Sequence, residues 1–200
     1  MVEAPIRPIN FSAARRAMVD SQLRTSGVTA EWAVGRMGSV PREDFVPASA
    51  KGVAYVDRAI PLGEGKFLAA PLFHGMMLQE AAPKSTDVAV VVDGGSGYLA
   101  QLLKPLVASL RVLTPEEALA SPRGGKKADL LLVDGAIEHV PASLAKRLAD
   151  NGRLVTGLAA NGVTRLATGR KAGNDIALLP LAEIGIPRLS QFDAPKSWSF

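Results

Sequence analysis

Two apolar runs without polar alternation, at residues 88–92 and 130–133, stand out along the chain. Uninterrupted runs of Val, Ala and Leu are typical of strands covered on both faces, as in the centre of a parallel sheet. The first run is followed by an acid, three glycines and an amphipathic stretch, which predicts a helix over 98–103. A strand, a glycine turn and a helix therefore form the centre of the expected fold.

Short strands and short helices alternate after residue 103, and the tail from residue 185 shows no regular period. We predict strands at 109–113, 129–133 and 153–158, helices at 115–120 and 141–149, and an antiparallel hairpin of 163–168 and 175–181. This order predicts the α/β fold class, with a doubly wound, mostly parallel sheet that ends in the C-terminal antiparallel hairpin.

Helical spacing and a long loop characterise the first 85 residues. Helices are predicted at 10–25, 30–37 and 72–82. The loop over 40–65 begins with a segment bracketed by Pro41 and Pro47, which fix φ and bias the preceding residues to extended forms. We therefore divide the chain into an N-terminal helical and loop region, residues 1–85, and a sheet core, residues 86–200.

The glycine turn offers a place for a ligand. Glycines accept φ > 0 and close approach of a ligand, and in an open α/β sheet ligands bind outside the carboxyl ends of the strands. We expect Asp93, Gly94, Gly95, Gly97 and Asp134 to contact such a ligand, because they follow two central strands. The alternative is that the glycines form a tight turn that binds nothing.

Composition narrows the possible functions. The 200 residues carry a net charge of +4 that is spread along the chain, so we expect no nucleic-acid partner. The absence of cysteine excludes disulfides and a thiol nucleophile, and with only two His we expect no metal site. No leader pattern and no apolar stretch approaching 18 residues is present, so we expect a cytoplasmic protein without a membrane partner.

Several strings follow one another in a recognisable order, among them 18–23 (Met-Val-Asp-Ser-Gln-Leu), 40–47 (Val-Pro-Arg-Glu-Asp-Phe-Val-Pro) and 95–98 (Gly-Ser-Gly-Tyr). Through them the chain resembles the protein-L-isoaspartate (D-aspartate) O-methyltransferase family, over roughly residues 12–158. The resemblance implies a Rossmann-like methyltransferase fold and S-adenosylmethionine as the methyl donor. It also implies, as acceptor, the isomerised aspartyl carboxylate of damaged proteins or peptides, that is, a role in protein repair.

The loop before the third helix departs from the family. The family reads Gly-Gln-Thr-Ile-Ser-x-Pro there, and its Ser is associated with substrate and catalysis, whereas residues 65–71 read Gly-Lys-Phe-Leu-Ala-Ala-Pro. Ala69 thus stands at the Ser position, and we assign no catalytic residue. Methyl transfer to a carboxylate needs mainly positioning and desolvation, so the missing hydroxyl weakens the hold on the substrate without abolishing the chemistry.

The donor site departs as well. Where the family has a ribose-binding acid, this chain has Thr114, and whether Glu116 or Glu117 in the next helix replaces that acid stays open. About sixteen residues separate Leu113 from Leu130, enough for one return crossing but not for a helix, a third strand and a second crossing. The core is therefore expected to lack part of the third βα unit, together with the wall that would support the adenine ring, so that donor binding is weak or lost.

Three interpretations remain open on the sequence. The first is a working methyltransferase. The second is a pseudoenzyme that keeps the fold as an interaction module and forms a homodimer through the bare strand at 109–113. The third is another nucleotide-binding protein, because residues 95–100 also fit G-x-G-x-x-A with Glu116 about twenty residues further on. His74 is interpreted as a core or rim residue and His139 as a solvated loop residue.

Overall fold

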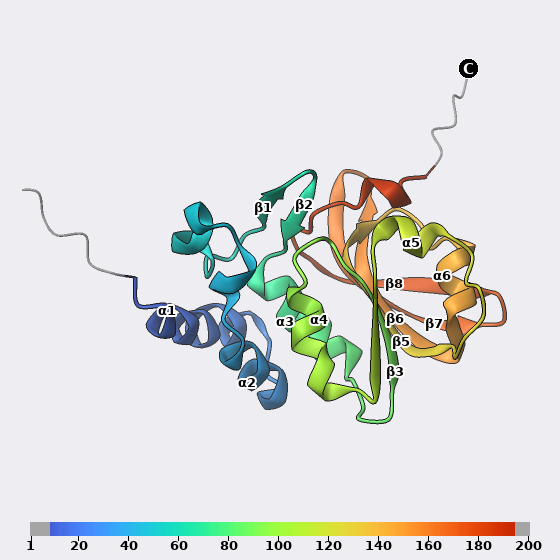
Figure 1. Ribbon diagram of the computed structural model, residues 1–200, viewed down its shortest axis with the longest axis horizontal. Helices are drawn as coiled ribbons and strands as arrows, with labels where there is room; N and C mark the ends of the chain where they lie inside the picture. Colours follow the sequence, from blue (N-terminus) through green and yellow to red (C-terminus); the bar gives the residue numbers. More distant parts are fainter. Residues whose placement is uncertain (1–8, 195–200) are drawn as a thin grey trace, which may run out of the picture.

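The computed structural model describes residues 9–194 and shows a helical N-terminal region beside a six-stranded sheet (Figure 1). The strand order is β4-β3-β5-β6-β7-β8. The strands are β3 (Val88–Val92), β4 (Ser109–Leu113), β5 (Ala128–Ile137), β6 (Leu148–Ala160), β7 (Val163–Ala172) and β8 (Asp175–Glu183). The pairs among β4, β3, β5 and β6 are parallel, and β7 and β8 are added antiparallel, which confirms the predicted fold class.

The two faces of the sheet are buried by different helices. Ala89 and Val91 of β3 face an apolar cluster that includes α3 (Pro71–Ala81), α4 (Tyr98–Leu103) and the N-terminal region. Val90 and Val92 face a second cluster, which includes residues of α5 (Pro115–Leu119) and α6 (Ala142–Arg147). Alternate side chains of one strand therefore enter two cores, which explains its unbroken apolar pattern.

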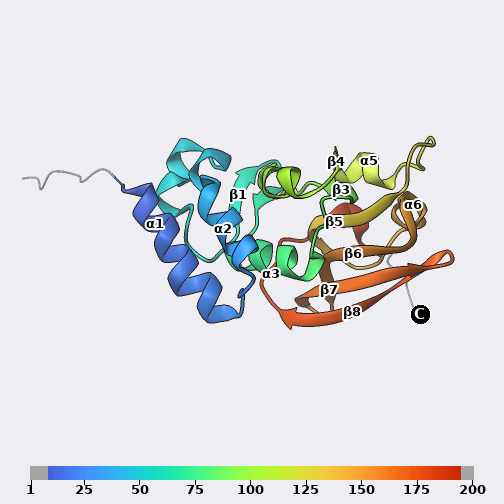
Figure 2. The ribbon, with the colours of Figure 1, turned by 90° about the horizontal axis from the view of Figure 1, so that it is seen from below.

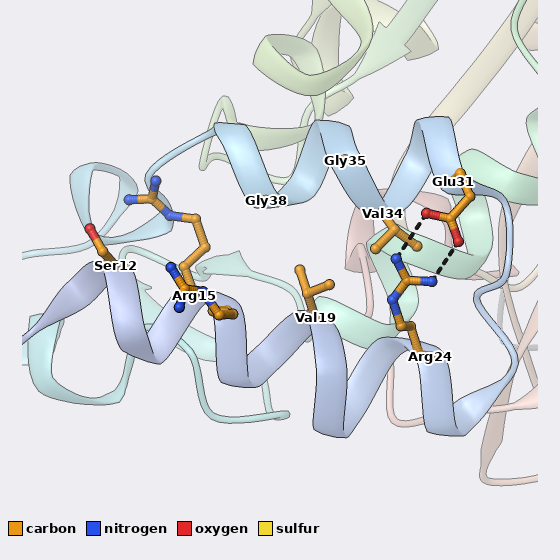
Figure 3. Close-up of a pocket in the computed structure, with 9 residues that line it drawn as sticks. Ser12, Arg15, Val19, Arg24, Glu31, Val34, Gly35 and Gly38 are labelled. Carbon is orange, nitrogen blue, oxygen red and sulfur yellow. Dashed lines mark hydrogen bonds and ion pairs between the residues drawn. The ribbon is translucent and has the colours of Figure 1, made fainter.

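The N-terminal region begins with a helical segment whose winding changes along its length. It consists of α1 (Phe11–Met18), a π-helical turn (Val19–Leu23) and a 3₁₀ turn (Arg24–Ser26), and it packs along α2 (Glu31–Ser39). Arg24 donates to both carboxylate oxygens of Glu31 across the groove between the two helices (Figure 3). The first of the large apolar clusters contains residues of this region and of the sheet. The division at residue 85 stays a prediction.

The long loop contains more regular structure than predicted. It holds 3₁₀ turns at Arg42–Phe45 and Ala48–Val53 and a hairpin of β1 (Ile60–Gly63) and β2 (Lys66–Leu68). The hairpin turn uses positive φ at Gly63, Glu64 and Gly65. Such a short hairpin has no room for an alternating apolar pattern, which explains why the sequence did not indicate it.

Strand β4 is an edge strand, and α5 is the one helix between β4 and β5 (Figure 2). No strand lies between β4 and β5 in the chain, and the absence of part of a third βα unit relative to the family stays a prediction. Within residues 9–194, no helix has both the length and the apolar character needed to cross a membrane.

The segment after β8, which was expected to be irregular, crosses the carboxyl edge of the sheet. We call residues 184–194 the C-terminal strap. The N–H of Ala136 donates to Pro187 O at 2.8 Å, and the N–H of Leu189 donates to Ala136 O at 2.9 Å. The strap thus pairs with the end of β5, which explains why β5 continues beyond the predicted strand.

Candidate functional site

A cavity of about 610 Å³ opens at the carboxyl ends of β3 and β4, where an open α/β sheet binds its ligands. Its volume lies within the range of small-molecule sites, roughly 300–1,000 Å³. Four segments line it: the turn of the β1–β2 hairpin, the glycine turn after β3, the start of α5 and the strap, at residues 64–66, 93–95, 112–117 and 188–191. We call this cavity the crevice.

Asp93 forms part of the wall of the crevice. Its Oδ1 accepts a hydrogen bond from the N–H of Gly97 at 2.9 Å, which closes the glycine turn. Burial, and then the neighbouring charge of Asp134, raise the pKa of Asp93 above its usual range. The site therefore carries a carboxylate whose charge the surrounding protein opposes, which is a property typical of functional sites.

The glycines of the turn after β3 are required by close packing within the protein. A Cβ at Gly94 would collide with the backbone oxygen of Asp134, and one at Gly95, which has φ +109°, would collide with the side chain of Lys66. Gly97 has φ +71° and precedes α4. The turn therefore needs these glycines with or without a ligand, and the argument for a binding site rests on the crevice itself.

Asp134, which was expected to contact a ligand, is not among the residues that line the crevice and lies behind its wall, with 4% of its surface exposed. Its Oδ1 accepts a hydrogen bond from Nε2 of His74 at 2.8 Å. Nδ1 of His74 faces Nη1 of Arg42 at 3.3 Å. A carboxylate can only accept and a guanidinium can only donate, so the partners place the imidazole proton on Nε2.

Arg42 is fully buried and sits at the other end of this network. Its guanidinium lies 5.0 Å from the centre of the Tyr98 ring, and it donates hydrogen bonds to the backbone oxygens of Ala54 and Ala69. Burial lowers its pKa, while the Tyr98 ring and the Asp134 carboxylate favour the cation. Arg42 thus ties the N-terminal region to the end of β5, a role that the sequence did not indicate.

The two histidines lie where expected, with His74 buried in the core and His139 exposed in a loop.

Ala69 is buried at the junction of β2 and α3. Beside that junction lies a second cavity of about 650 Å³, between Ala70 and Leu72 on one side and residues 183–188 on the other. Arg188 lines both this cavity and the crevice, so the two hollows are neighbours.

The first turn of α5 contains both acids whose role the sequence left open. The hydroxyl of Thr114 accepts from the N–H of Glu117 at 3.2 Å, and the Glu117 carboxylate accepts from the N–H of Thr114 at 2.9 Å. This capping box occupies both side chains. The carboxylate of Glu116 instead accepts from Nε2 of Gln191 in the strap at 2.9 Å.

Comparison with known proteins gives consistent matches. The family model described as Protein-L-isoaspartate(D-aspartate) O-methyltransferase (PCMT) matches residues 13–117. The protein-L-isoaspartate O-methyltransferase of Roseiflexus castenholzii is 28% identical and covers 88% of this chain and 91% of its own length. The protein-L-isoaspartate O-methyltransferase of Methylorubrum populi is 30% identical, and the match covers 72% of this chain and 78% of that relative.

A solved structure has the same fold. It is described as a beta-aspartate methyltransferase (PCMT) from Plasmodium falciparum in complex with S-adenosyl-L-homocysteine. It superposes on 92% of this chain and 100% of its own, with a TM-score of 0.67 and 17% sequence identity.

Proposed function

Because the chain belongs to the protein-L-isoaspartate(D-aspartate) O-methyltransferase family, we propose that it methylates the carboxyl group of isoaspartyl residues in proteins or peptides, with S-adenosylmethionine as donor. The observation that carries the proposal is the pair of neighbouring cavities, one at the sheet edge for the donor and one beside Ala69 for the acceptor. The alternative, a relative kept only as an interaction module, is not favoured, because the family match includes the strand and turn that form the crevice.

The residues of the crevice suit this donor. When bound, S-adenosylmethionine supplies a methyl group on a positively charged sulfur. Asp93 presents an anionic side chain to a cavity that takes a cation, and Gly94 and Gly95 line the crevice beside it. We propose Asp93, Gly94 and Gly95 as donor contacts, with Gly97 and Asp134 holding them in place through the contacts described above.

For transfer of a methyl group to a carboxylate, the protein has to hold donor and acceptor in line and to exclude water. The acceptor oxygen attacks the methyl carbon as the bond from that carbon to sulfur breaks, and no proton has to move. We therefore propose no acid or base. The network of Arg42, His74 and Asp134 fixes the two cavities relative to each other, because it joins the Ala69 carbonyl to the end of β5.

The acceptor side is proposed to take an isoaspartyl peptide beside Ala69. The 650 Å³ cavity is bordered by apolar side chains, by the carboxylates of Asp57 and Glu183, and by Arg58 and Arg188, two cations that can attract the substrate carboxylate. Arg188 is also paired with Glu138 and Asp193, so its charge is partly compensated. We further propose that the protein acts in the cytoplasm, without nucleic acid or membrane as partner, and that copies pair through the free edge of β4.

A methyl-transfer assay tests the function. Incubation with donor labelled in its methyl group is expected to label an isoaspartyl peptide and to leave the same peptide with ordinary aspartate unlabelled. Isothermal titration with S-adenosylmethionine and with its demethylated product measures donor binding separately. Binding without transfer to any isoaspartyl peptide would instead support the interaction module, and the absence of both would reject the proposed function.

A further inference from the structure

The C-terminal strap is firmly anchored where it crosses the sheet. Besides its bonds to Ala136, Ile186 donates its N–H to the hydroxyl of Thr164 at 3.0 Å, and Glu138 donates its N–H to Phe192 O at 3.3 Å. Phe192 is fully buried in the second apolar cluster. The strap is therefore part of the folded core and presents a fixed surface to the crevice.

That surface lines the same crevice as the end of β4, the strand after which the sequence predicts that part of a βα unit is missing. Because β4 is the edge of the sheet, no further strand supports the crevice beyond it within residues 9–194. The crevice nevertheless has a wall on the strap side, formed by residues 188–191. Leu189, whose side chain packs in the second apolar cluster, lies in that wall, and Leu113 and Pro115 line the crevice from the sheet and α5.

A polar pair lies beside the apolar wall. Glu116 lines the crevice, and its carboxylate is oriented by the amide of Gln191, which also lines it. Thr114 and Glu117 are occupied by the capping box, so Glu116 is the carboxylate of this turn that remains available to a ligand. Hydrogen bonds from its own backbone N–H and from Gln191 lower the pKa of Glu116, which keeps the carboxylate ionised near neutral pH.

We propose that the strap replaces the missing third βα unit in binding the adenosyl part of the donor. Leu189 supplies an apolar wall for the adenine ring, and Glu116, held by Gln191, accepts hydrogen bonds from the ribose hydroxyls. This inference rests on the proposed function for the identity of the donor. An ionised carboxylate can accept from two neighbouring hydroxyls, and an acid about twenty residues after a glycine turn commonly binds ribose in doubly wound folds.

Titration of the demethylated product, S-adenosylhomocysteine, tests the assignment without relying on catalysis. Glu116→Gln keeps the size of the side chain and removes its charge, and Gln191→Ala removes the group that orients it. We expect the dissociation constant to rise about tenfold or more for Glu116→Gln, and by a smaller factor for Gln191→Ala. Glu80→Gln, an exposed acid on α3 outside the crevice lining, is the matched control and is expected to bind like the wild type.

A second pair of ligands separates a ribose contact from a general effect of charge. Adenosine and 2′,3′-dideoxyadenosine differ only in the two ribose hydroxyls. The Glu116→Gln substitution is expected to weaken adenosine binding and to leave dideoxyadenosine binding unchanged. An equal loss for both ligands would overturn the ribose assignment, as would a variant that binds S-adenosylhomocysteine as tightly as the wild type.

The outcomes also distinguish this inference from the function on which it rests. If the wild type binds S-adenosylhomocysteine and methylates isoaspartyl peptides while Glu116→Gln and Gln191→Ala bind normally, the function stands and the assigned role of the strap is wrong. If the wild type binds neither the donor nor its product, both are wrong. Thermal unfolding of each variant shows whether a loss of binding reflects a loss of folded protein.

Discussion

Asp93 places a carboxylate in the crevice wall, where burial and the charge of Asp134 both oppose its ionisation. Asn at this position can keep the hydrogen bond from the N–H of Gly97 while removing the charge. We expect Asp93→Asn to be more stable than the wild type at neutral pH and to bind S-adenosylmethionine about tenfold more weakly. Urea denaturation and isothermal titration measure the two effects.

The pH dependence of this stability difference follows from the raised pKa of Asp93. The folded state binds the proton of Asp93 more tightly than the unfolded state, so ionisation of Asp93 costs stability as pH rises above its ordinary value of about 4. The advantage of Asp93→Asn should therefore grow as pH rises through the interval up to the folded pKa and then level off. A difference that is constant from about pH 3 to pH 8 would contradict the assigned cause.

Ala69 is the residue at which the family's loop has lost its hydroxyl. Ala69→Ser restores a donor beside the acceptor cavity, and a hydrogen bond to a carboxylate is worth about 1.5–3 kcal/mol. We expect the KM for an isoaspartyl peptide to fall about tenfold or more, with the dissociation constant for S-adenosylhomocysteine unchanged. A steady-state assay of methyl transfer, which gives KM separately from kcat, checks this.

At the scale of elements, the imidazole of His74 joins α3 to the 3₁₀ turn that carries Arg42 and to the end of β5. Leu at this position would leave the buried Asp134 carboxylate and one guanidinium N–H without their partner. We expect His74→Leu to lower the free energy of unfolding by roughly 2–4 kcal/mol. Chemical denaturation measures this, and His139→Leu in an exposed loop is expected to change it by less than about 0.5 kcal/mol.

The contact between β5 and the strap requires glycine at position 135. A Cβ at Gly135 would lie 2.6 Å from Cγ of Leu189, so Gly135→Ala should displace the strap and cost about 1–3 kcal/mol. Leu189→Ala alone removes a buried side chain and costs about 2–3 kcal/mol. The double variant should lose clearly less unfolding free energy than the sum of the two single losses, because alanine at position 189 makes room for the new methyl group.

Thermal unfolding of the four proteins gives the coupling energy, and S-adenosylhomocysteine titration shows whether displacing the strap opens the crevice. Strict additivity of the two substitutions would mean that the strap and β5 do not depend on this contact.

The elements that the sequence predicted best are those whose pattern is local. The apolar run of β3, the glycine turn and α4 lie next to one another in the chain, and the structure has them as predicted. The strap is held by contacts with Ala136, Thr164 and Glu116, which lie far from it in the sequence, and its own residues show no period. The sequence did not indicate the role of Arg42 for the same reason, because its partners His74 and Ala69 come from a later helix and loop.

At the scale of the whole molecule, the single helix between β4 and β5 has two consequences. On the carboxyl side of the sheet the strap forms one wall of the crevice. Along the sheet, β4 becomes an edge with exposed Val112 and Arg111. The number of residues between the two strands predicts that part of a βα unit is missing, but it could not show that a segment about seventy residues further on lines the crevice.

The proposed dimer of two copies forms through the edge strand β4. The charge of Arg111 on that strand determines the affinity of the two copies for each other. An antiparallel pair that sets Leu110 opposite Val112 also sets Arg111 opposite its own counterpart, and like charges placed so cost up to about 1 kcal/mol. We therefore expect weak dimerisation at low salt that strengthens as salt screens the two guanidinium groups. Arg111→Thr should tighten the low-salt dimer up to about fivefold, because it removes the repulsion and favours a strand.

Sedimentation equilibrium at low and high salt measures this association. Arg123→Thr, in the loop after α5, makes the same change of charge away from the strand and is expected to leave the low-salt dissociation constant close to that of the wild type. If high salt weakens the association, or if both variants tighten it equally, net charge and not the β4 edge governs the contact. If wild type and Arg111→Thr are monomers at every concentration, the edge is protected in some other way and the pairing does not occur.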